Sequence, residues 1–222
     1  MEQTECILPT FGELTEQQIV FINKNSYAVH HRTGEIILMQ ERPVSHLLYV
    51  KSGLLKLYKV IEDGRQVILD VVPAEKFIGL TSVFYKSLYL YSASSIGEGE
   101  LIYTSASAIR EIVAENGKYA LNLMTVLSSQ VVYLVERMIT LTKKQVPGRI
   151  AEVLLFFSKN IYKSHEFTLP LSRNEIADYI QTTKESVSRT LTEFRNDRII
   201  ELDDKNVVLK SLDLLEILNK IG

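Results

Sequence analysis

Apolar positions in Leu171–Arg195 follow two short helical patterns that a polar stretch separates. In the second pattern Val187, Leu191 and Phe194 recur at i, i+4 and i+7, so they share one face that would be buried. In the first pattern the expected buried side chains are Ile176, Ala177 and Ile180. The spacing predicts a helix, a tight turn and a second helix.

The opposite face of the second helix is polar. An acidic group, hydroxyls and a guanidinium would face water there, from Glu185, Ser188, Arg189 and Thr192. These groups suit the base edges of a DNA major groove. Thr182 or Thr183 can cap the start of this helix. On the two helices alone, an αα-hairpin with a solvated polar face is an equally good interpretation.

The sequence after the two helices favours DNA binding. Residues 198–202 and 207–209 form two short β-rich runs, and the polar stretch 203–206 between them is typical of a hairpin turn. Helix, turn, helix and β-wing is the order of a winged helix, which is a more specific signal than two helices.

Between about His30 and Thr104 the pattern changes to short β-rich runs with turn residues between them. Asp63-Gly64 is the strongest hairpin signal among these turns. The pattern predicts an antiparallel sandwich or barrel, preceded by a short amphipathic helix in residues 11–24. The expected strands are Glu35–Met39, Leu47–Val50, Leu54–Val60, Val67–Val72 and Glu100–Tyr103.

A long helix is expected from about Lys118 to Lys144, and Pro147-Gly148 would end it. Its apolar positions alternate spacings of four and three, as in the seam of a coiled coil. These positions are Leu127, Val131, Leu134, Met138 and Leu141. The narrow seam favours a two-fold dimer, and the alternative is a stripe that packs on the chain's own barrel.

Composition places the chain among globular proteins, since 46% of its 222 residues are hydrophobic and 23% are charged. The formal net charge of −2 argues against a protein that coats nucleic acid, so DNA binding would need a local basic surface. The lone Cys6 favours a reducing compartment. Because no signal peptide or membrane span is recognisable, we expect a cytoplasmic protein without a membrane partner.

Several local motifs extend this layout. TGEIILMQE, LLYVKSGLLKLYK and DGRQVILDVVPAEKFIGL follow one another in the β-rich region, VPGRIAEVLLFFS follows the long helix, and LSRNEIADYIQTTKESVSRTL spans the two short helices. These segments resemble the β-roll, the start of the DNA-binding domain and the helix-turn-helix of the cAMP receptor protein/FNR (Crp/Fnr) family of bacterial transcription regulators.

The resemblance implies an α+β fold with a cyclic-nucleotide-binding-like β-roll (jelly roll) at the N-terminus, a long dimerisation helix and a C-terminal winged helix-turn-helix. We expect a β-roll sensor domain in residues 1–117, the dimerisation helix and hinge in 118–146, and the DNA-binding domain in 147–222. Double-stranded DNA, a second copy of the chain and RNA polymerase are the implied partners.

By the resemblance, Glu185, Ser188 and Arg189 occupy the base-reading positions. Arg189 would pair with guanine, Glu185 would accept from cytosine and Ser188 could approach thymine, which implies a TTGA-type half-site in an inverted repeat. The position that usually holds glycine in the turn is Gln181, at a cost of about 1–2 kcal/mol if its backbone is left-handed. The expected phosphate contacts are Ser172, Arg173, Thr183 and Lys184.

The cAMP-binding positions of the family differ here. Leu80 stands in place of a ribose-binding glutamate, and Tyr91 stands in place of a phosphate-binding arginine. Neither can make the expected contacts, so we predict that cAMP does not bind. A pocket for an apolar or planar ligand, or no ligand, is the expectation. Its candidate residues are Gly79, Leu80, Thr81, Tyr91, Ser92, Gln130 and Leu134.

Two further effector classes exist in the family. An iron–sulfur centre needs a cysteine cluster, which one cysteine cannot form. Haem that senses carbon monoxide or nitric oxide is the remaining alternative. Its candidate axial ligands are His30, His31, His46, Met39 and Met138. The effector, whether a small molecule or a gas, stays unidentified.

A cupin-like enzyme and a cyclic-nucleotide module without a DNA role are alternatives from other classes. Cupin sites need converging metal ligands, whereas His30 and His31 are adjacent and would point to opposite faces of a strand. Cys6 has no neighbouring base that would activate it. The winged helix argues against both alternatives, so we expect no enzyme and no metal site.

Overall fold

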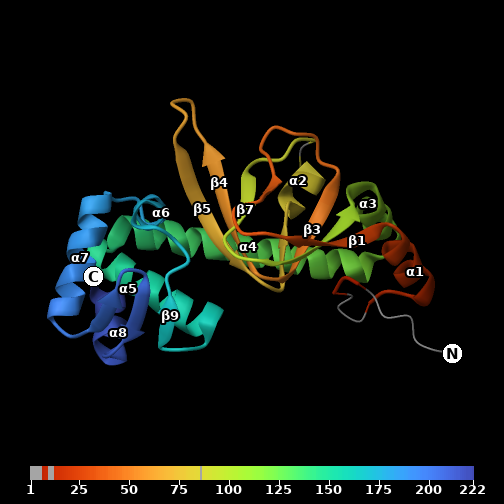
Figure 1. Cartoon of the computed structure of the whole chain (residues 1–222). Helices are drawn as coiled ribbons and strands as arrows, with labels where there is room; N and C mark the ends of the chain where they lie inside the picture. The colour runs from red at the N-terminus through yellow and green to blue at the C-terminus, as the bar shows by residue number, and fades with distance from the viewer. Residues whose placement is uncertain (1–6, 10–12, 86) are drawn as a thin grey trace. The chain divides into compact units, whose positions relative to one another are not determined.

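The computed structural model describes residues 7–9, 13–85 and 87–222, so Cys6 and the first residues of the helix expected from residue 11 lie outside the described part. The chain forms two compact units, of which the first comprises Met1–Arg65 and Leu69–Tyr133 and the second comprises Gln66–Ile68 and Leu134–Gly222; the main boundary lies between Tyr133 and Leu134. Both boundary residues lie in the long helix α4 (Gly117–Lys143), which is drawn in green in Figure 1.

The first unit is built on two antiparallel sheets. Their strand orders are β1-β8-β3-β6 and β2-β7-β4-β5. The strands are β1 (Ser26–His31), β2 (Ile36–Leu38), β3 (His46–Ser52), β4 (Leu54–Val60), β5 (Gln66–Pro73), β6 (Lys76–Ile78), β7 (Ser92–Ser95) and β8 (Gly99–Ser105). Apart from the β4–β5 hairpin, strands that follow one another in sequence are not paired with each other in either sheet, as the crossed connections of a β-roll require.

Alternation along the strands divides the apolar side chains between two cores. On β3, Leu47 points to one side of its sheet and Leu48 to the other, because successive side chains of a strand face opposite ways. The same alternation separates Phe77 from Ile78 on β6. One core lies inside the roll, and the other lies between the outer face of the β1-β8-β3-β6 sheet and helices.

The helices that cover this outer core are short. α1 begins with a capping box in which the Thr15 hydroxyl accepts the backbone N–H of Gln18, and the Gln18 side chain accepts the N–H of Thr15. Ile22 of α1 and Ile109 of α3 are both fully buried in this core. The helices are α1 (Glu16–Lys24), α2 (Leu80–Tyr85) and α3 (Ala106–Glu115).

The second unit is a winged helix with an added C-terminal helix. Its elements are α5 (Val146–Phe156), the π-helical turn η1 (Phe157–Tyr162), β9 (Glu166–Thr168), α6 (Arg173–Tyr179), α7 (Lys184–Asn196), β10 (Ile200–Asp203), β11 (Asn206–Leu209) and α8 (Leu212–Ile221). The sheet has the order β10-β11-β9, so the predicted wing hairpin gains a third strand from before the helix-turn-helix. Pro147 lies in the first turn of α5, where its missing N–H costs nothing.

The sequence-based elements agree with this fold in kind and differ in detail. The long helix, the winged helix and the five predicted strands are present with shifts of a residue or two. The prediction missed β1, β6, β7, β9, α2, η1 and α8. β7 reads Ser-Ala-Ser-Ser and is buried throughout, so its hydrophobic pattern is too weak to indicate a strand. Its Ser92 and Ser95 hydroxyls accept the N–H groups of Gln40 and Glu35 instead.

Candidate DNA-binding site and sensor segment

The second helix of the helix-turn-helix, α7, has the two faces that its sequence predicts. Thr183 caps its start, since the Thr183 Oγ1 accepts the backbone N–H of Ser186 at 3.2 Å. Val187, Leu191 and Phe194 are buried as expected. The sequence did not indicate that Thr190 would be buried beside them.

The opposite face of α7 is open to solvent. Glu185, Arg189 and Thr192 are exposed and Ser188 is half-buried. The Thr192 hydroxyl donates to the Ser188 carbonyl at 2.8 Å, which uses a bond within the helix. The carboxylate and guanidinium side chains therefore stand together on one accessible stripe, which is the chemistry that base edges require.

The first helix, α6, is fixed at its start by a capping box. The Ser172 hydroxyl accepts the N–H of Glu175 at 3.2 Å, and the Glu175 carboxylate accepts the Ser172 N–H at 2.9 Å. The Ser172 hydroxyl also lies 2.9 Å from that carboxylate. Ser172, which was expected to contact phosphate, is therefore used as a helix cap. It also lines the cavity described below.

The turn between the two helices contains Gln181 in a left-handed conformation, with φ of 54°. The predicted condition for strain at this residue is therefore met, and the cost is about 1–2 kcal/mol. The Thr182 N–H donates to the Ala177 carbonyl at 2.9 Å, which closes the end of α6 across this residue. Ile176, Ala177 and Ile180 are buried, as their spacing predicts.

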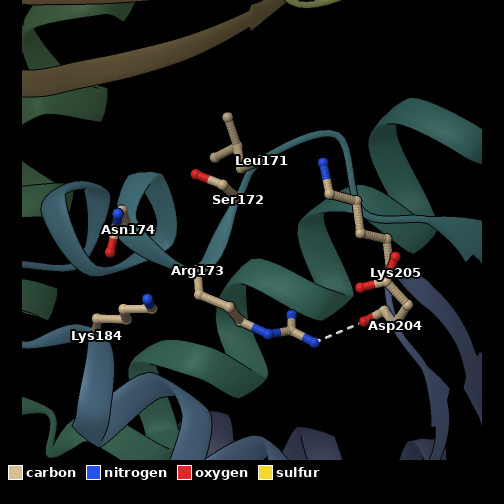
Figure 2. A pocket seen from close by; sticks show the side chains of 7 residues that line it. All are labelled: Leu171, Ser172, Arg173, Asn174, Lys184, Asp204 and Lys205. Atoms are coloured by element: carbon tan, nitrogen blue, oxygen red, sulfur yellow. Dashed lines mark hydrogen bonds between the residues drawn. The ribbon is translucent and has the colours of Figure 1, made fainter.

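A cavity of about 240 Å³ lies where α6, α7 and the wing meet. Figure 2 shows basic side chains from all three elements around it, Arg173 from α6, Lys184 from α7 and Lys205 from the wing turn. Its lining residues are Leu171, Ser172, Arg173, Asn174, Lys184, Asp204 and Lys205. The net positive lining suits a phosphate oxygen.

Arg173 is oriented by the wing. Its Nη2 donates to the backbone carbonyl of Asp204 at 2.8 Å, the bond drawn in Figure 2. Burial lowers the pKa of Arg173, while the nearby Asp204 carboxylate raises it. The guanidinium stays charged at neutral pH because an arginine pKa lies far above 7. Arg173 and Lys184 were predicted from the sequence as phosphate contacts, but Lys205 was not. The one sequence feature that could have indicated Lys205 is its place in the predicted wing turn.

The segment expected to bind the effector, called the sensor segment here, comprises residues 79–85 and 87–91. The backbone N–H of Gly79, at its start, is hydrogen-bonded to the side chain of Tyr91, at its end. The Tyr91 hydroxyl accepts the Gly79 N–H at 2.9 Å and hydrogen bonds with the Thr81 side chain. Gly79 has φ of 83°, a conformation that glycine adopts without strain. Burial raises the pKa of Tyr91, so the phenol is neutral. An amide that could bind a ligand anion is therefore occupied by a tyrosine.

The predicted pocket residues do not all come together. Leu80 is 1% exposed and belongs to the outer core, whereas Tyr91 packs against the core inside the roll. Ser92 is buried with its hydroxyl engaged, and Leu134 belongs to the other compact unit. Leu80 was expected to line a ligand pocket together with Tyr91. Instead it packs in the outer core, on the other side of the sheet from the core that Tyr91 contacts.

Gln130 has a structural contact in place of a ligand. Its Nε2 donates to the Phe77 carbonyl at 3.2 Å, so α4 is tied to the strand that leads into the sensor segment. The Tyr133 hydroxyl donates to Asp70 of β5 at 2.8 Å in the same unit. These two bonds join the long helix to the β-roll without any added molecule.

The candidate haem ligands do not form a haem site in this fold. His31 is buried with its ring against Gly53 and Gly99, where even an added methyl on Gly99 would lie 2.8 Å from Nε2. That packing leaves no room for a macrocycle. His30 is exposed on the opposite face of β1, as adjacent strand residues should be.

The surroundings of the other candidates are different. His46 packs against Tyr27 and Tyr103, while Met39 and Met138 are exposed. Across residues 7–9, 13–85 and 87–222, no group of three or more His, Cys, Asp or Glu side chains is arranged to hold a metal ion. In the same described ranges, no helix has the length and apolar character to cross a membrane.

α4 carries an exposed apolar stripe that differs from the predicted seam. Val131 and Met138 are 57% and 68% exposed, in line with the prediction, but Leu127 is partly covered by the outer core. Met124 and Val135 lie on the same side of the helix and are 60% and 50% exposed. Of the other predicted seam residues, Leu134 is 50% exposed and Leu141 is half-buried. The open stripe therefore comprises Met124, Val131, Leu134, Val135 and Met138.

Comparison with known proteins agrees with both units. Residues 148–218 match the family model described as the Crp-like helix-turn-helix domain, and residues 28–116 match the cyclic nucleotide-binding domain. The chain belongs to the Crp/Fnr family of transcription regulators. Its second unit is a helix-turn-helix DNA-binding domain, and its relatives are regulators and not enzymes.

Individual members of the Crp/Fnr family match most of the chain. The transcriptional activator protein FnrA of Stutzerimonas stutzeri is 27% identical over 188 residues, which cover 82% of this chain and 77% of FnrA. A CRP-like cAMP-activated global transcriptional regulator of Mycobacterium tuberculosis is 24% identical over 209 residues, covering 92% and 93%. The structure of FixK2 from Bradyrhizobium japonicum superimposes with a TM-score of 0.79 at 22% identity, covering 87% of this chain and 97% of FixK2.

Proposed function

We propose that this Crp/Fnr regulator acts as a homodimer that reads a TTGA-type inverted repeat and does not respond to cAMP. The observation that carries the reading role is the solvent-facing stripe of α7, on which Glu185 and Arg189 are exposed and Ser188 is half-buried. Arg189 would donate to guanine O6 and N7, and Glu185 would accept from a cytosine amino group. Two such helices related by a two-fold axis call for an inverted repeat about one helical turn apart.

The cavity beside α7 supports this orientation. Arg173, Lys184 and Lys205 would hold a phosphate of the DNA backbone at the edge of the major groove. Their positive charges are local in a chain whose net charge is −2, so binding would be directed to this surface. The expected phosphate contacts at Ser172 and Thr183 become helix caps that place the cationic groups.

The apolar stripe on α4 supports the dimer. Within the stripe, Val131, Leu134 and Met138 follow spacings of three and four and present a seam that a second α4 can cover. A dimer also supplies the symmetry that an inverted repeat requires. The relatives named as activators make RNA polymerase the further partner that we propose.

The sensor segment supports independence from cAMP. The Gly79 N–H is already bonded to Tyr91, and Leu80 is buried in the outer core. A cyclic nucleotide would have to displace a neutral tyrosine, and it would meet Leu80 and Tyr91 at the positions where cAMP-binding members carry the ribose-binding carboxylate and the phosphate-binding guanidinium. One relative, which is 24% identical to this chain, is named as cAMP-activated. The independence from cAMP that we propose would separate this chain from that relative.

The test is a binding titration with a fluorescent TTGA inverted repeat and a scrambled duplex of the same length. Arg189→Ala should weaken binding to the repeat by about 10- to 100-fold and leave scrambled binding nearly unchanged. The matched control is Arg65→Ala, which removes an exposed arginine from the first unit. Equal binding of the repeat by Arg189→Ala and wild type, or no preference for the repeat in wild type, would contradict the reading role.

A further inference from the structure

The turn of the helix-turn-helix is held by two arginines from other elements. Arg137 of α4 donates from Nη2 to the Tyr179 carbonyl at 2.6 Å. Arg149 of α5 donates from Nη1 to the Ile180 carbonyl at 2.6 Å and to the Gln181 carbonyl at 3.3 Å. Three successive carbonyls at the end of α6 therefore accept from guanidinium groups.

These bonds supply what the local sequence lacks. The last carbonyls of a helix have no partner in the helix itself. The carbonyls of Ala177 and Asp178 are bonded within the turn, to the N–H groups of Thr182 and Gln181. The next three carbonyls are bonded by the two arginines, and positive charge at a helix C-terminus is favourable. The strained residue Gln181 lies inside this clamp.

Arg137 is fixed in two directions. Its Cζ lies 3.8 Å from the centre of the Tyr179 ring, within cation–π distance. Tyr179 is buried, so the ring offers a rigid surface on which the guanidinium can lie flat. A lysine at this position could keep the charge but would lose the planar contact and one fixed donor direction.

The position of Arg137 on α4 gives the contact a consequence. Arg137 immediately precedes Met138 and follows Leu134 by three residues, so it borders the exposed apolar stripe. The same turn of α4 that would meet a partner α4 thus holds the end of α6, just before the turn that leads into the reading helix. All the atoms of this clamp lie in the second unit.

We infer that Arg137 is a positioning residue for DNA recognition, which transmits the placement of the paired α4 helices to α7 through the Tyr179–Gln181 turn. The inference rests on the proposed dimer and its inverted repeat. With the clamp intact, each recognition helix is tied to the dimer axis, and the protein accepts one spacing between half-sites. Without it, the reading helices adapt to other spacings and bind each of them less tightly.

The first arm of the test needs no DNA. Hydrogen exchange is measured on full-length wild type, Arg137→Ala, Arg137→Lys and the control Lys143→Ala, which removes an exposed cation from the same helix. The amides of Gln181 and Thr182 should exchange about tenfold faster in Arg137→Ala, less so in Arg137→Lys, and at the wild-type rate in Lys143→Ala. Wild-type protection in Arg137→Ala would overturn the clamp.

The second arm measures half-site spacing. Wild type and the three variants are titrated with TTGA repeats whose spacer is native, one base pair longer or one shorter. The ratio of native to altered affinity should fall at least about threefold in Arg137→Ala, with partial recovery in Arg137→Lys. A purely structural role would weaken all spacers equally, so an unchanged ratio would overturn the inference. Arg137→Lys keeps this arm decisive if Arg137→Ala does not fold.

The two proposals fail in different ways. A wild type without preference for the TTGA repeat would overturn the proposed function and the spacing role together. A wild type that prefers the repeat, combined with an Arg137→Ala variant that keeps both its protection and its spacing ratio, would overturn the positioning role alone.

Discussion

α7 buries one face and exposes the other, whereas α4 buries only Tyr119 and Leu123, and the exposed side chains of the two helices have opposite chemistry. On α7 the exposed stripe presents Glu185 and Arg189 to solvent. On α4 it presents Val131, Val135 and Met138. Exposed charged side chains are well solvated, so leaving them uncovered costs little free energy. A contiguous apolar stripe gains free energy when another surface covers it. The first face therefore suits a polar, reversible partner such as DNA, and the second suits a second protein chain.

The comparison shows why amphipathic spacing alone did not separate the two roles. Both helices have apolar residues at intervals of three and four, and only the side that stays exposed distinguishes them. Leu127 illustrates the difficulty, because it fits the heptad of the exposed seam but is partly covered by its own unit. Arg137 joins the two helices, since it lies beside the apolar stripe and holds the turn before α7.

The largest effect should come from charging the apolar stripe. Val131→Asp places a carboxylate in the centre of the proposed seam, so the dimer should dissociate because a buried charge without a partner is costly. Loss of simultaneous binding to two half-sites should weaken DNA binding by at least about 100-fold. Sedimentation and the titration with the TTGA repeat measure both effects.

The control for this variant is Val20→Asp, which charges a comparably exposed valine on α1. It should leave the dimer and DNA affinity unchanged. A Val131→Asp protein that remains dimeric, or that binds the repeat as a monomer with wild-type affinity, would break the distinction drawn between the two helices.

A smaller effect is expected from a substitution in the sensor segment. Together with added cAMP, this variant tests whether the first unit binds a nucleotide. Tyr91→Phe removes the acceptor of the Gly79 N–H and should lower the free energy of unfolding by about 1–3 kcal/mol. Millimolar cAMP should leave the urea midpoint unchanged in wild type and in the variant. Tyr27→Phe, which loses only a long 3.5 Å contact to His46, is the matched control. A midpoint that rises with cAMP would show that the segment still binds nucleotide.

The smallest effect should come from relief of the turn that precedes α7. Gln181→Gly removes side-chain strain at φ of 54° and should raise the free energy of unfolding by about 1 kcal/mol, or the melting temperature by about 2–4 °C. Part of the gain is offset by the greater freedom of glycine in the unfolded chain. Gln181→Ala should give no such gain in calorimetry, and an equal gain in both variants would mean that the turn is not strained.

The winged helix could be predicted from sequence because its signals are local. A capping threonine, two amphipathic periods and a polar hairpin turn all lie within about forty residues, and each is set by neighbours in the chain. Arg189 and Glu185 were identified for the same reason, since their positions follow from the helical period once the buried face is known. The left-handed backbone at Gln181 was anticipated only as a condition, because the resemblance places Gln181 where the family usually has glycine.

The sensor segment and the arginine clamp could not be predicted in the same way. Whether Leu80 faces a pocket or a core depends on the helix that packs over it, and that helix comes from elsewhere in the chain. The bond from Arg137 to Tyr179 spans 42 residues and leaves no periodic trace in the sequence. The same holds for β7, whose burial is explained by hydrogen bonds to Gln40 and Glu35 and not by its polar composition.

If the open stripe on α4 pairs with a second copy, as proposed, the stability of the protein should depend on its concentration. Since only the folded chain can pair, each dimer formed draws on the folded population, and the melting temperature should rise with protein concentration. At low copy number the protein would occupy fewer of its DNA sites, and proteases would cleave it more readily because a larger fraction of the chains would be unfolded. Expression level could therefore act as an input to this regulator, with newly made chains protected once enough partners are present.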